Sequence, residues 1–150
     1  MIKIAHRGNL NGPNVDLENQ PEYIISAINE SFSCEVDLWN IQGKLLLGHD
    51  EPQYSIDFDF LESFKQHLWI HCKNLSALDF MLSKDPSFKS FWHQNDDYTI
   101  TTNGYIWTFP NRPTVDKSIL VHLGVPSSDL ESKTYAGICS DFIKQFELII

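Results

Sequence analysis

The spacing of apolar residues alternates between strand-like and helix-like along the first half of the chain, and this alternation constrains the fold more than any other feature. Short apolar or alternating segments predict strands, and apolar residues three or four positions apart predict helices. Strands that alternate with helices are typical of βαβ units in a mostly parallel sheet. We expect strands at residues 2–5, 32–40, 44–47 and 68–72, and helices around residues 21–28, 58–64 and 75–82.

The second half of the chain has room for strands but for few helices. Thr102, Asn103 and Gly104 form either a hairpin turn, which would place an antiparallel pair in the sheet, or an ordinary loop between a strand and a helix. A chain of 150 residues with 42% hydrophobic residues can bury one substantial core, so we expect a single domain over residues 1–150. Short strands are predicted at residues 91–93, 98–101, 105–109, 119–123 and 136–139.

The composition narrows the classes of partner and compartment. The chain has 20 acidic and 11 basic residues and a formal net charge of −9, which disfavours nucleic acid or an anionic membrane as a partner. The three cysteines form no CxxC pair and fit a reducing compartment. No apolar run reaches the length of a signal peptide or a membrane-spanning helix. We therefore expect a cytoplasmic protein without membrane insertion, and the sequence predicts no oligomeric state.

Two acidic residues share one face of the second predicted strand. Side chains alternate along a strand, so Glu35 and Asp37 project together while Cys34 and Val36 point to the other face. The apolar neighbours favour a central strand, where a buried pair of acids needs a cation. On an edge strand the same pair would be solvated. The pair predicts half of a site for a hard divalent cation.

Two histidines lie where predicted strands end. His6 follows the first strand, and His49 follows the strand at residues 44–47. Two histidines near neutral pH can supply both the proton donor and the proton acceptor that cleavage of a phosphodiester requires. Either residue could instead be structural, with its hydrogen bonds satisfied inside the fold. His93, at the end of the predicted strand at residues 91–93, could line the same pocket.

Four short motifs in register resemble those of one enzyme family. They are His6-Arg7-Gly8, Glu18-Asn19, Glu35-Val36-Asp37 and His49-Asp50. In order and in approximate spacing the motifs are similar to those of the glycerophosphodiester phosphodiesterase family, part of the phosphatidylinositol-phospholipase-C-like phosphodiesterase superfamily. The resemblance covers roughly the first half of the chain, ending at Lys73. It implies an α/β fold, a TIM-barrel-like (β/α) barrel abbreviated in its second half, with the site at the carboxyl ends of the strands.

The resemblance also implies catalytic and substrate-binding roles. His6 and His49 would be the acid and base, without an indication of which is which. Arg7 and Lys73 would bind the phosphate. The supporting residues, which orient the site, would be Glu18, Asn19 and Asp50.

The resemblance further implies a divalent metal ion, Mg²⁺, Ca²⁺ or Mn²⁺. Glu35 and Asp37 would be two of its ligands. His71 occupies the position where the family usually supplies a third acidic ligand. Because imidazole is a softer donor than carboxylate, His71 as a ligand would shift the preference towards Mn²⁺ or Zn²⁺.

Together these features predict a hydrolase, a metal-dependent phosphodiesterase that cleaves a small glycerol- or sugar-phosphodiester of lipid metabolism by acid/base catalysis. The expected partner is therefore a small-molecule phosphodiester substrate. Two alternatives stay open. One is a catalytically weakened module that binds a phosphorylated ligand or a partner protein, and the other is a metal-independent, phospholipase-C-like lyase.

Overall fold

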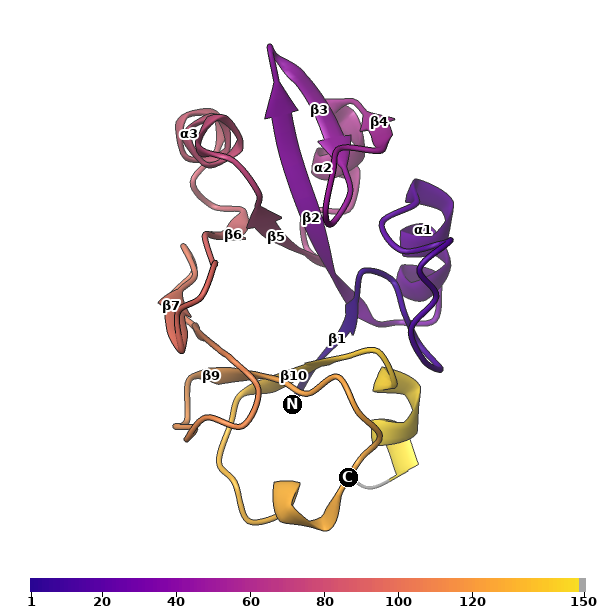
Figure 1. Ribbon diagram of the computed structural model, residues 1–150, viewed down its shortest axis with the longest axis vertical. Coiled ribbons are helices and arrows are strands. Elements are labelled where there is room, and N and C mark those ends of the chain that lie inside the picture. The colour runs from indigo at the N-terminus through magenta and orange to yellow at the C-terminus, as the bar shows by residue number, and fades with distance from the viewer. Residues whose placement is uncertain (149–150) are drawn as a thin grey trace.

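The computed structural model describes residues 1–148, which contain one ten-stranded sheet, three α-helices and two 3-10 helices (Figure 1). The strands are β1 (Ile2–His6), β2 (Ser33–Ile41), β3 (Lys44–Leu47), β4 (Tyr54–Ile56), β5 (Leu68–Cys72), β6 (Lys89–Phe91), β7 (Tyr98–Ile100), β8 (Ile106–Thr108), β9 (Ser118–Val121) and β10 (Gly137–Ser140). The helices are α1 (Pro21–Asn29), α2 (Phe58–Ser63), α3 (Leu75–Lys84), η1 (Ser128–Leu130) and η2 (Ile143–Leu148).

The sheet is mixed and strongly curled (Figure 1). Its main path has the order β4-β3-β2-β1-β10-β9-β8-β7 and forms a half-barrel, to which β5 and β6 are attached through β2. The strands from β6 through β5, β2, β1, β10 and β9 to β8 are parallel to their neighbours. Antiparallel pairs lie at the ends, between β7 and β8 and among β2, β3 and β4. The parallel strands therefore bring their carboxyl ends to one edge.

The expected TIM-barrel-like (β/α) barrel is wrong. In such a barrel each strand is followed by a helix, and the fold typically takes about 250 residues. Here α-helices separate only β1 from β2, β4 from β5 and β5 from β6 within residues 1–148, and the later strands follow one another through loops, a hairpin and the short helix η1. After α3 no α-helix follows any strand within residues 1–148, so the repeating strand–helix unit of a barrel is lost.

The segment Thr102-Asn103-Gly104 forms a hairpin turn, the first of the two alternatives that its sequence allowed. It joins β7 to the antiparallel β8. The amide of Thr101 donates to the carbonyl of Tyr105 at 2.9 Å, and Gly104 has a φ of +83°, a conformation that glycine adopts without a steric penalty.

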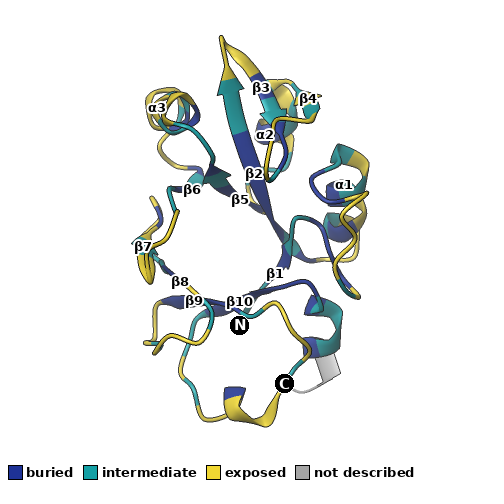
Figure 2. Ribbon diagram, viewed as in Figure 1, coloured by how far each residue is buried: buried dark blue, intermediate teal, exposed yellow. Residues whose placement is uncertain are grey.

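Two hydrophobic clusters lie on the two faces of the curled sheet. Figure 2 shows that much of β2 and β10 is buried. The larger cluster packs one sheet face against the helices, with Ile24 of α1, Leu61 of α2 and Met81 of α3 all buried. The smaller one fills the opposite face and includes Trp69 and Trp107. Because side chains alternate along β2 and β5, residues that share a face with Trp69 include the acidic pair of β2. No helix within residues 1–148 is long and apolar enough to cross a bilayer.

Strand register places predicted site residues side by side. In the parallel pair of β1 and β2, His6 lies opposite Glu35. In the pair of β2 and β5, Asp37 lies opposite His71. Residues at the same level of adjacent strands point to the same face of a sheet, so these four side chains meet at one edge.

Candidate functional site

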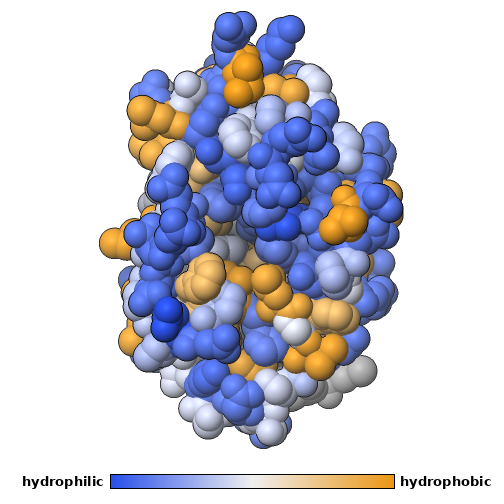
Figure 3. Space-filling model, viewed as in Figure 1, coloured by the Kyte–Doolittle hydropathy of each residue, from blue (hydrophilic) through white to orange (hydrophobic). Residues whose placement is uncertain are grey.

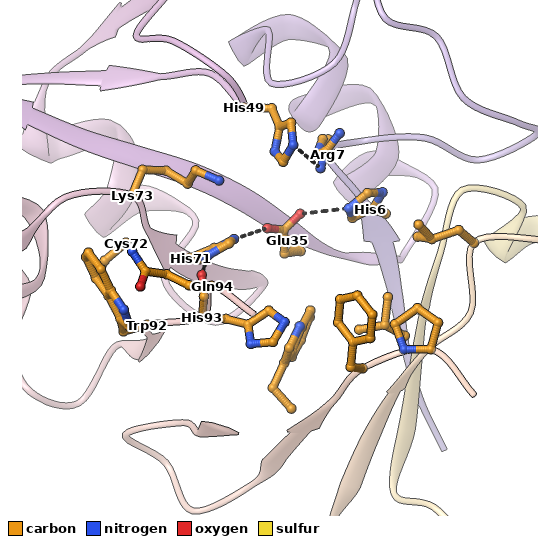
Figure 4. Close-up of a pocket in the computed structure, with 15 residues that line it drawn as sticks. His6, Arg7, Glu35, His49, His71, Cys72, Lys73, Trp92, His93 and Gln94 are labelled. Carbon is orange, nitrogen blue, oxygen red and sulfur yellow. Dashed lines mark hydrogen bonds and ion pairs between the residues drawn. The ribbon is translucent and has the colours of Figure 1, made fainter. Parts of the chain in front are cut away.

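A pocket of about 350 Å³ lies at the carboxyl ends of β1, β2 and β5 (Figure 4). This volume is near the lower end of the range for small-molecule sites. One side, which we call the charged wall, is lined by His6, Arg7, Glu35, His49, His71 and Lys73. The other side, the apolar wall, is lined by Trp92, Trp107, Phe109, Pro110, Val121 and Leu123, with His93 and Gln94 among them.

Glu35, Asp37 and His71 form a buried group that could hold a metal ion. Each residue offers one ligand atom, and these atoms lie within 4.8 Å of one another. His71 Nδ1 is 3.1 Å from Asp37 Oδ1 and 3.7 Å from Glu35 Oε1. Asp37 Oδ1 and Glu35 Oε2 are buried and make no hydrogen bond of good geometry within the described part of the chain. Metal–ligand bonds of about 2.0–2.6 Å match the spacing of these atoms, so the donor set and its unsatisfied oxygens fit a divalent cation.

The second oxygen of Asp37 is fixed by its neighbours. The Asn19 side-chain amide donates to Asp37 Oδ2 at 2.9 Å, and its carbonyl accepts from the Asp37 amide at 2.9 Å. Arg7 Nε lies 3.1 Å from the same Oδ2. Burial raises the pKa of Asp37, but hydrogen bonds from His49 and His71 and the charge of Arg7 outweigh it and hold the pKa well below its usual range. Asp37 is therefore an ionised carboxylate whose Oδ1 faces His71.

Arg7 connects Asp37 to His49. Its Nη1 donates to Glu18 Oε2 at 3.0 Å, and its Nη2 lies 3.2 Å from His49 Nε2. A guanidinium only donates, so His49 Nε2 is the acceptor and the ring proton resides on Nδ1. That Nδ1 lies 3.4 Å from Asp37 Oδ2, and the His49 side chain is 39% exposed. In this arrangement His49 accepts at Nε2 and lines the pocket.

The loop that carries His49 is tied to β2 by Gly48. The Gly48 amide donates to the Asp37 carbonyl at 3.0 Å, and its carbonyl accepts from Trp39 Nε1 at 2.6 Å. A Cβ at this position would lie 2.0 Å from the carbonyl oxygen of Glu51. Only glycine leaves room for the turn that presents His49 beside Asp37.

His6 contacts carboxylates at both ring nitrogens, and these contacts raise its pKa. Its Nδ1 is 2.8 Å from Asp141 Oδ1, and its Nε2 is 3.9 Å from Glu35 Oε2. Burial lowers the pKa of His6, but the hydrogen bond to Asp141 and the charge of Glu35 outweigh it, so the pKa is raised above its ordinary value. Asn9 holds Asp141 in place by donating to its Oδ1 at 2.8 Å and to Glu18 Oε1 at 2.9 Å. These contacts favour a protonated His6.

His71 lies between the acidic pair and a backbone carbonyl. Its Nε2 is 2.9 Å from the carbonyl oxygen of His93, and its ring stacks on that of Phe91 with centroids 5.1 Å apart. Burial lowers the pKa of His71, but hydrogen bonds to Asp37 and Glu35 outweigh it and raise the pKa to about 9. A histidine that donates one ring N–H to a carbonyl has the orientation usual for metal-ligating histidines, because its other nitrogen is then aimed at the ion.

The remaining predicted residues lie at different depths. Lys73 Nζ is 3.5 Å from Asp37 Oδ1 and lines the pocket. Glu18 and Asn19, both buried, contact site residues directly. Asp50 is 3.5 Å from His49 Nε2, but its side chain is 95% exposed, and contacts between exposed charges stabilise a structure little. Asp50 therefore lies at the surface beside the site.

Sequence reasoning did not select Asp141 and Asn9 as site residues. Asp141 is the first residue after β10, and β10 pairs with β1, which carries His6. A carboxylate directly after an apolar strand was the available signal. Its partner could not be identified, because the pairing of the first and last strands is not encoded in local periodicity.

Comparison with known protein families, curated proteins and solved structures finds no match to this chain.

Proposed function

We propose that the protein is a metal-dependent phosphodiesterase that cleaves a small phosphodiester. The observation that carries the proposal is the pair of histidines on one pocket, each with different hydrogen-bond partners. Asp141 and Glu35 favour a protonated His6, whereas Arg7 leaves His49 Nε2 as an acceptor. General acid/base catalysis requires one group of each kind.

In this proposal His49 Nε2 accepts the proton of the attacking hydroxyl, which belongs to water or to the substrate. The new O–P bond forms as the opposite P–O ester bond breaks, and His6 donates its proton to the departing oxygen. Arg7 now donates to His49 Nε2, and a bound phosphate would compete for that guanidinium and uncover the nitrogen. Arg7 and Lys73 offset the charge that develops on the phosphate oxygens.

Glu35, Asp37 and His71 would hold the metal ion. A divalent cation supplies Lewis-acid stabilisation of the anionic phosphate. Two carboxylates and one imidazole favour Mn²⁺ or Zn²⁺ over Ca²⁺. The four motifs that resemble those of glycerophosphodiester phosphodiesterases support the same reaction on sequence grounds.

A metal-independent phosphodiesterase is the second candidate, and the charge balance of the site favours it. When His6 and His71 are both protonated, the cations of the site equal its carboxylates in number. His71, with a pKa of about 9, would then take the place of the metal between the acids. The carboxylates are Glu18, Glu35, Asp37 and Asp141, and the cations are Arg7, Lys73, His6 and His71.

Turnover of bis(4-nitrophenyl) phosphate distinguishes these candidates. We expect activity that disappears in chelator and returns with Mn²⁺ or Zn²⁺. Undiminished turnover in chelator would support the metal-independent reaction. No turnover with Mn²⁺, Zn²⁺, Mg²⁺ or Ca²⁺ would contradict both reactions and favour a module that binds phosphate without cleaving it. Calorimetric titration with Mn²⁺ tests the metal site separately from activity.

A further inference from the structure

One wall of the pocket is charged and the other is apolar, so the two ends of a bound substrate would meet different surfaces. The apolar wall comes from β8, β9 and the residues that follow β6, β8 and β9. Trp107 and Val121 are only 4% and 9% exposed and form its inner part, whereas Phe109 and Leu123 are 42% and 41% exposed and form its rim. Figure 3 shows hydrophilic side chains above the centre of this face of the molecule and a group of hydrophobic ones below it. A phosphate held by the charged wall therefore leaves one of its ester groups against apolar surface.

An apolar wall does not suit a polyhydroxylated group. A glycerol or sugar hydroxyl pressed against it would lose its hydrogen bonds to water without replacement, and such a loss is unfavourable. An apolar group placed there would release water from both surfaces. Exposed apolar side chains gathered at the mouth of a pocket are typical of ligand contacts.

The wall is also largely aromatic. The Trp107 ring stacks on that of Phe91 with centroids 4.4 Å apart, and the His93 ring lies 5.5 Å from that of Phe109. Both ring nitrogens of His93 are buried and have no hydrogen-bond partner among residues 1–148. The surface is thus suited to a planar ring, with His93 as a hydrogen-bonding position beside it.

We propose that the diester accepted by this site carries one compact apolar substituent, best matched by an aryl ring, that binds between Phe109, Leu123 and Trp107. This inference rests on the proposed phosphodiesterase and replaces the glycerol or sugar group expected from sequence. A pocket of about 350 Å³ holds a phosphate and a ring but not two long acyl chains. The substituent is compact for that reason.

Binding of phosphate monoesters tests the inference without requiring turnover. Phenyl phosphate, glycerol 3-phosphate and inorganic phosphate are titrated into the protein by calorimetry in the presence of Mn²⁺. We expect phenyl phosphate to bind at least about tenfold more tightly than glycerol 3-phosphate, because burying a ring removes apolar surface from water. Equal or tighter binding of glycerol 3-phosphate would overturn the inference, as would a failure of all three to bind.

Variants at the rim of the apolar wall test whether the preference for a ring arises there. Phe109→Ser and Leu123→Ser change exposed side chains, so the fold should tolerate both. Each should weaken the binding of phenyl phosphate about three- to tenfold and leave the binding of inorganic phosphate unchanged. Ile100→Ser is the matched control, because Ile100 is 75% exposed and lies outside this pocket. Equal losses for both ligands, or the same loss in the control, would overturn the inference.

The outcomes separate the two proposals. If the ring preference holds but no diester is cleaved, the reaction is wrong and the ligand class stands. If diesters are cleaved but glyceryl diesters are preferred over aryl diesters of equal leaving-group reactivity, the reaction stands and the ligand class is wrong.

Discussion

At the scale of single residues, the protonation of His71 should control metal binding at the site. A pKa of about 9 means that the metal-free protein carries an imidazolium between Glu35 and Asp37 at neutral pH. An imidazole must lose the proton on its ligating nitrogen before it can bind a metal ion, so metal and proton compete for Nδ1. This competition separates a ligand role for His71 from a structural one.

We expect the affinity for Mn²⁺ to rise roughly tenfold per pH unit between pH 7 and the His71 pKa of about 9. Holding His71 deprotonated at pH 7 costs about 2.7 kcal/mol, since each pH unit below the pKa corresponds to about 1.4 kcal/mol. Calorimetric titration with Mn²⁺ from pH 6.5 to 8.5 measures the slope. His71→Gln should flatten it, and the same slope in both proteins would contradict ligation by His71.

His71 should also make the metal-free protein less stable as pH rises. Its pKa is higher in the folded chain than in the unfolded chain, so its stabilising contribution is complete below about pH 6.5 and is lost as pH rises through about 9. In chelator, the difference in free energy of unfolding between wild type and His71→Gln should shrink by up to about 3 kcal/mol over that interval. Urea unfolding at several pH values measures it, and a difference independent of pH would contradict the ion pairs of His71.

His6 and His49 should each be required for turnover. His6→Asn and His49→Asn should lower kcat about 10²- to 10⁴-fold, the usual effect of removing a general acid or base. His67→Asn is the control, because His67 is exposed and lies away from the pocket. Circular dichroism checks that each variant is folded. A loss of tenfold or less in both site variants would mean that the two histidines are structural.

Short-range patterns predicted part of the arrangement of side chains in the candidate site. Alternation along one strand placed Glu35 and Asp37 on one face, and the register of β2 and β5 adds His71 beside Asp37. The pairing of His6 with Asp141 joins residues at opposite ends of the chain, and nothing local in the sequence indicates it. The roles implied by resemblance to a known family stay predictions.

At the scale of elements, Asn74 links a helix to the site. Its side chain caps α3 by accepting from the Ala77 amide at 3.0 Å, and it exchanges hydrogen bonds with the backbone of Asn40 in β2 at 3.2 and 2.9 Å. Lys73 is the residue before it, and the Lys73 amide donates to the Leu38 carbonyl at 2.8 Å. The cap therefore fixes both the start of α3 and the position of Lys73.

Asn74→Ala should lower the free energy of unfolding by about 2 kcal/mol, from the lost cap and the lost bonds to β2. It should also weaken binding of inorganic phosphate through Lys73. Asp57→Ala is the matched control, because Asp57 caps α2 by accepting from the Phe60 amide at 2.9 Å, away from the site. We expect the control variant to lower the free energy of unfolding by about 1 kcal/mol and to bind inorganic phosphate as tightly as the wild type. Equal phosphate affinities in the two variants would contradict the link to Lys73.

Individual elements were predicted more accurately than their arrangement. Most strands and helices lie close to the expected ranges, because apolar spacing reports which residues of a segment are buried, but β4 was not expected. The barrel was wrong because that spacing does not report which strands pair. Thr102-Asn103-Gly104 illustrates this, since its sequence allowed both a hairpin and a longer connection until the pairing of β7 with β8 decided between them.

At the scale of the whole molecule, the curled sheet gathers a site from segments far apart in the chain. β1, β2, β5 and β10 are adjacent through parallel pairing, although α1, α2 and residues 73–136 separate them in sequence. Glu35 and Asp37 lie on β2, which pairs with β1, β3 and β5. An ion bound by these acids and His71 would join two neighbouring strands at the centre of the sheet, so metal binding should stabilise the entire fold.

Mn²⁺ at about 100 times its dissociation constant should therefore raise the free energy of unfolding by about 2.7 kcal/mol, and the melting temperature by several degrees. The net charge of −9 means that cations also gather at the surface without a specific site. Glu35→Gln removes one proposed ligand and should abolish most of the shift, whereas Asp50→Asn removes an acid that is 95% exposed and should preserve it. Differential scanning fluorimetry with and without chelator, at constant ionic strength, measures both. An equal shift in the two variants would mean that the stabilisation comes from the acidic surface and not from the buried group.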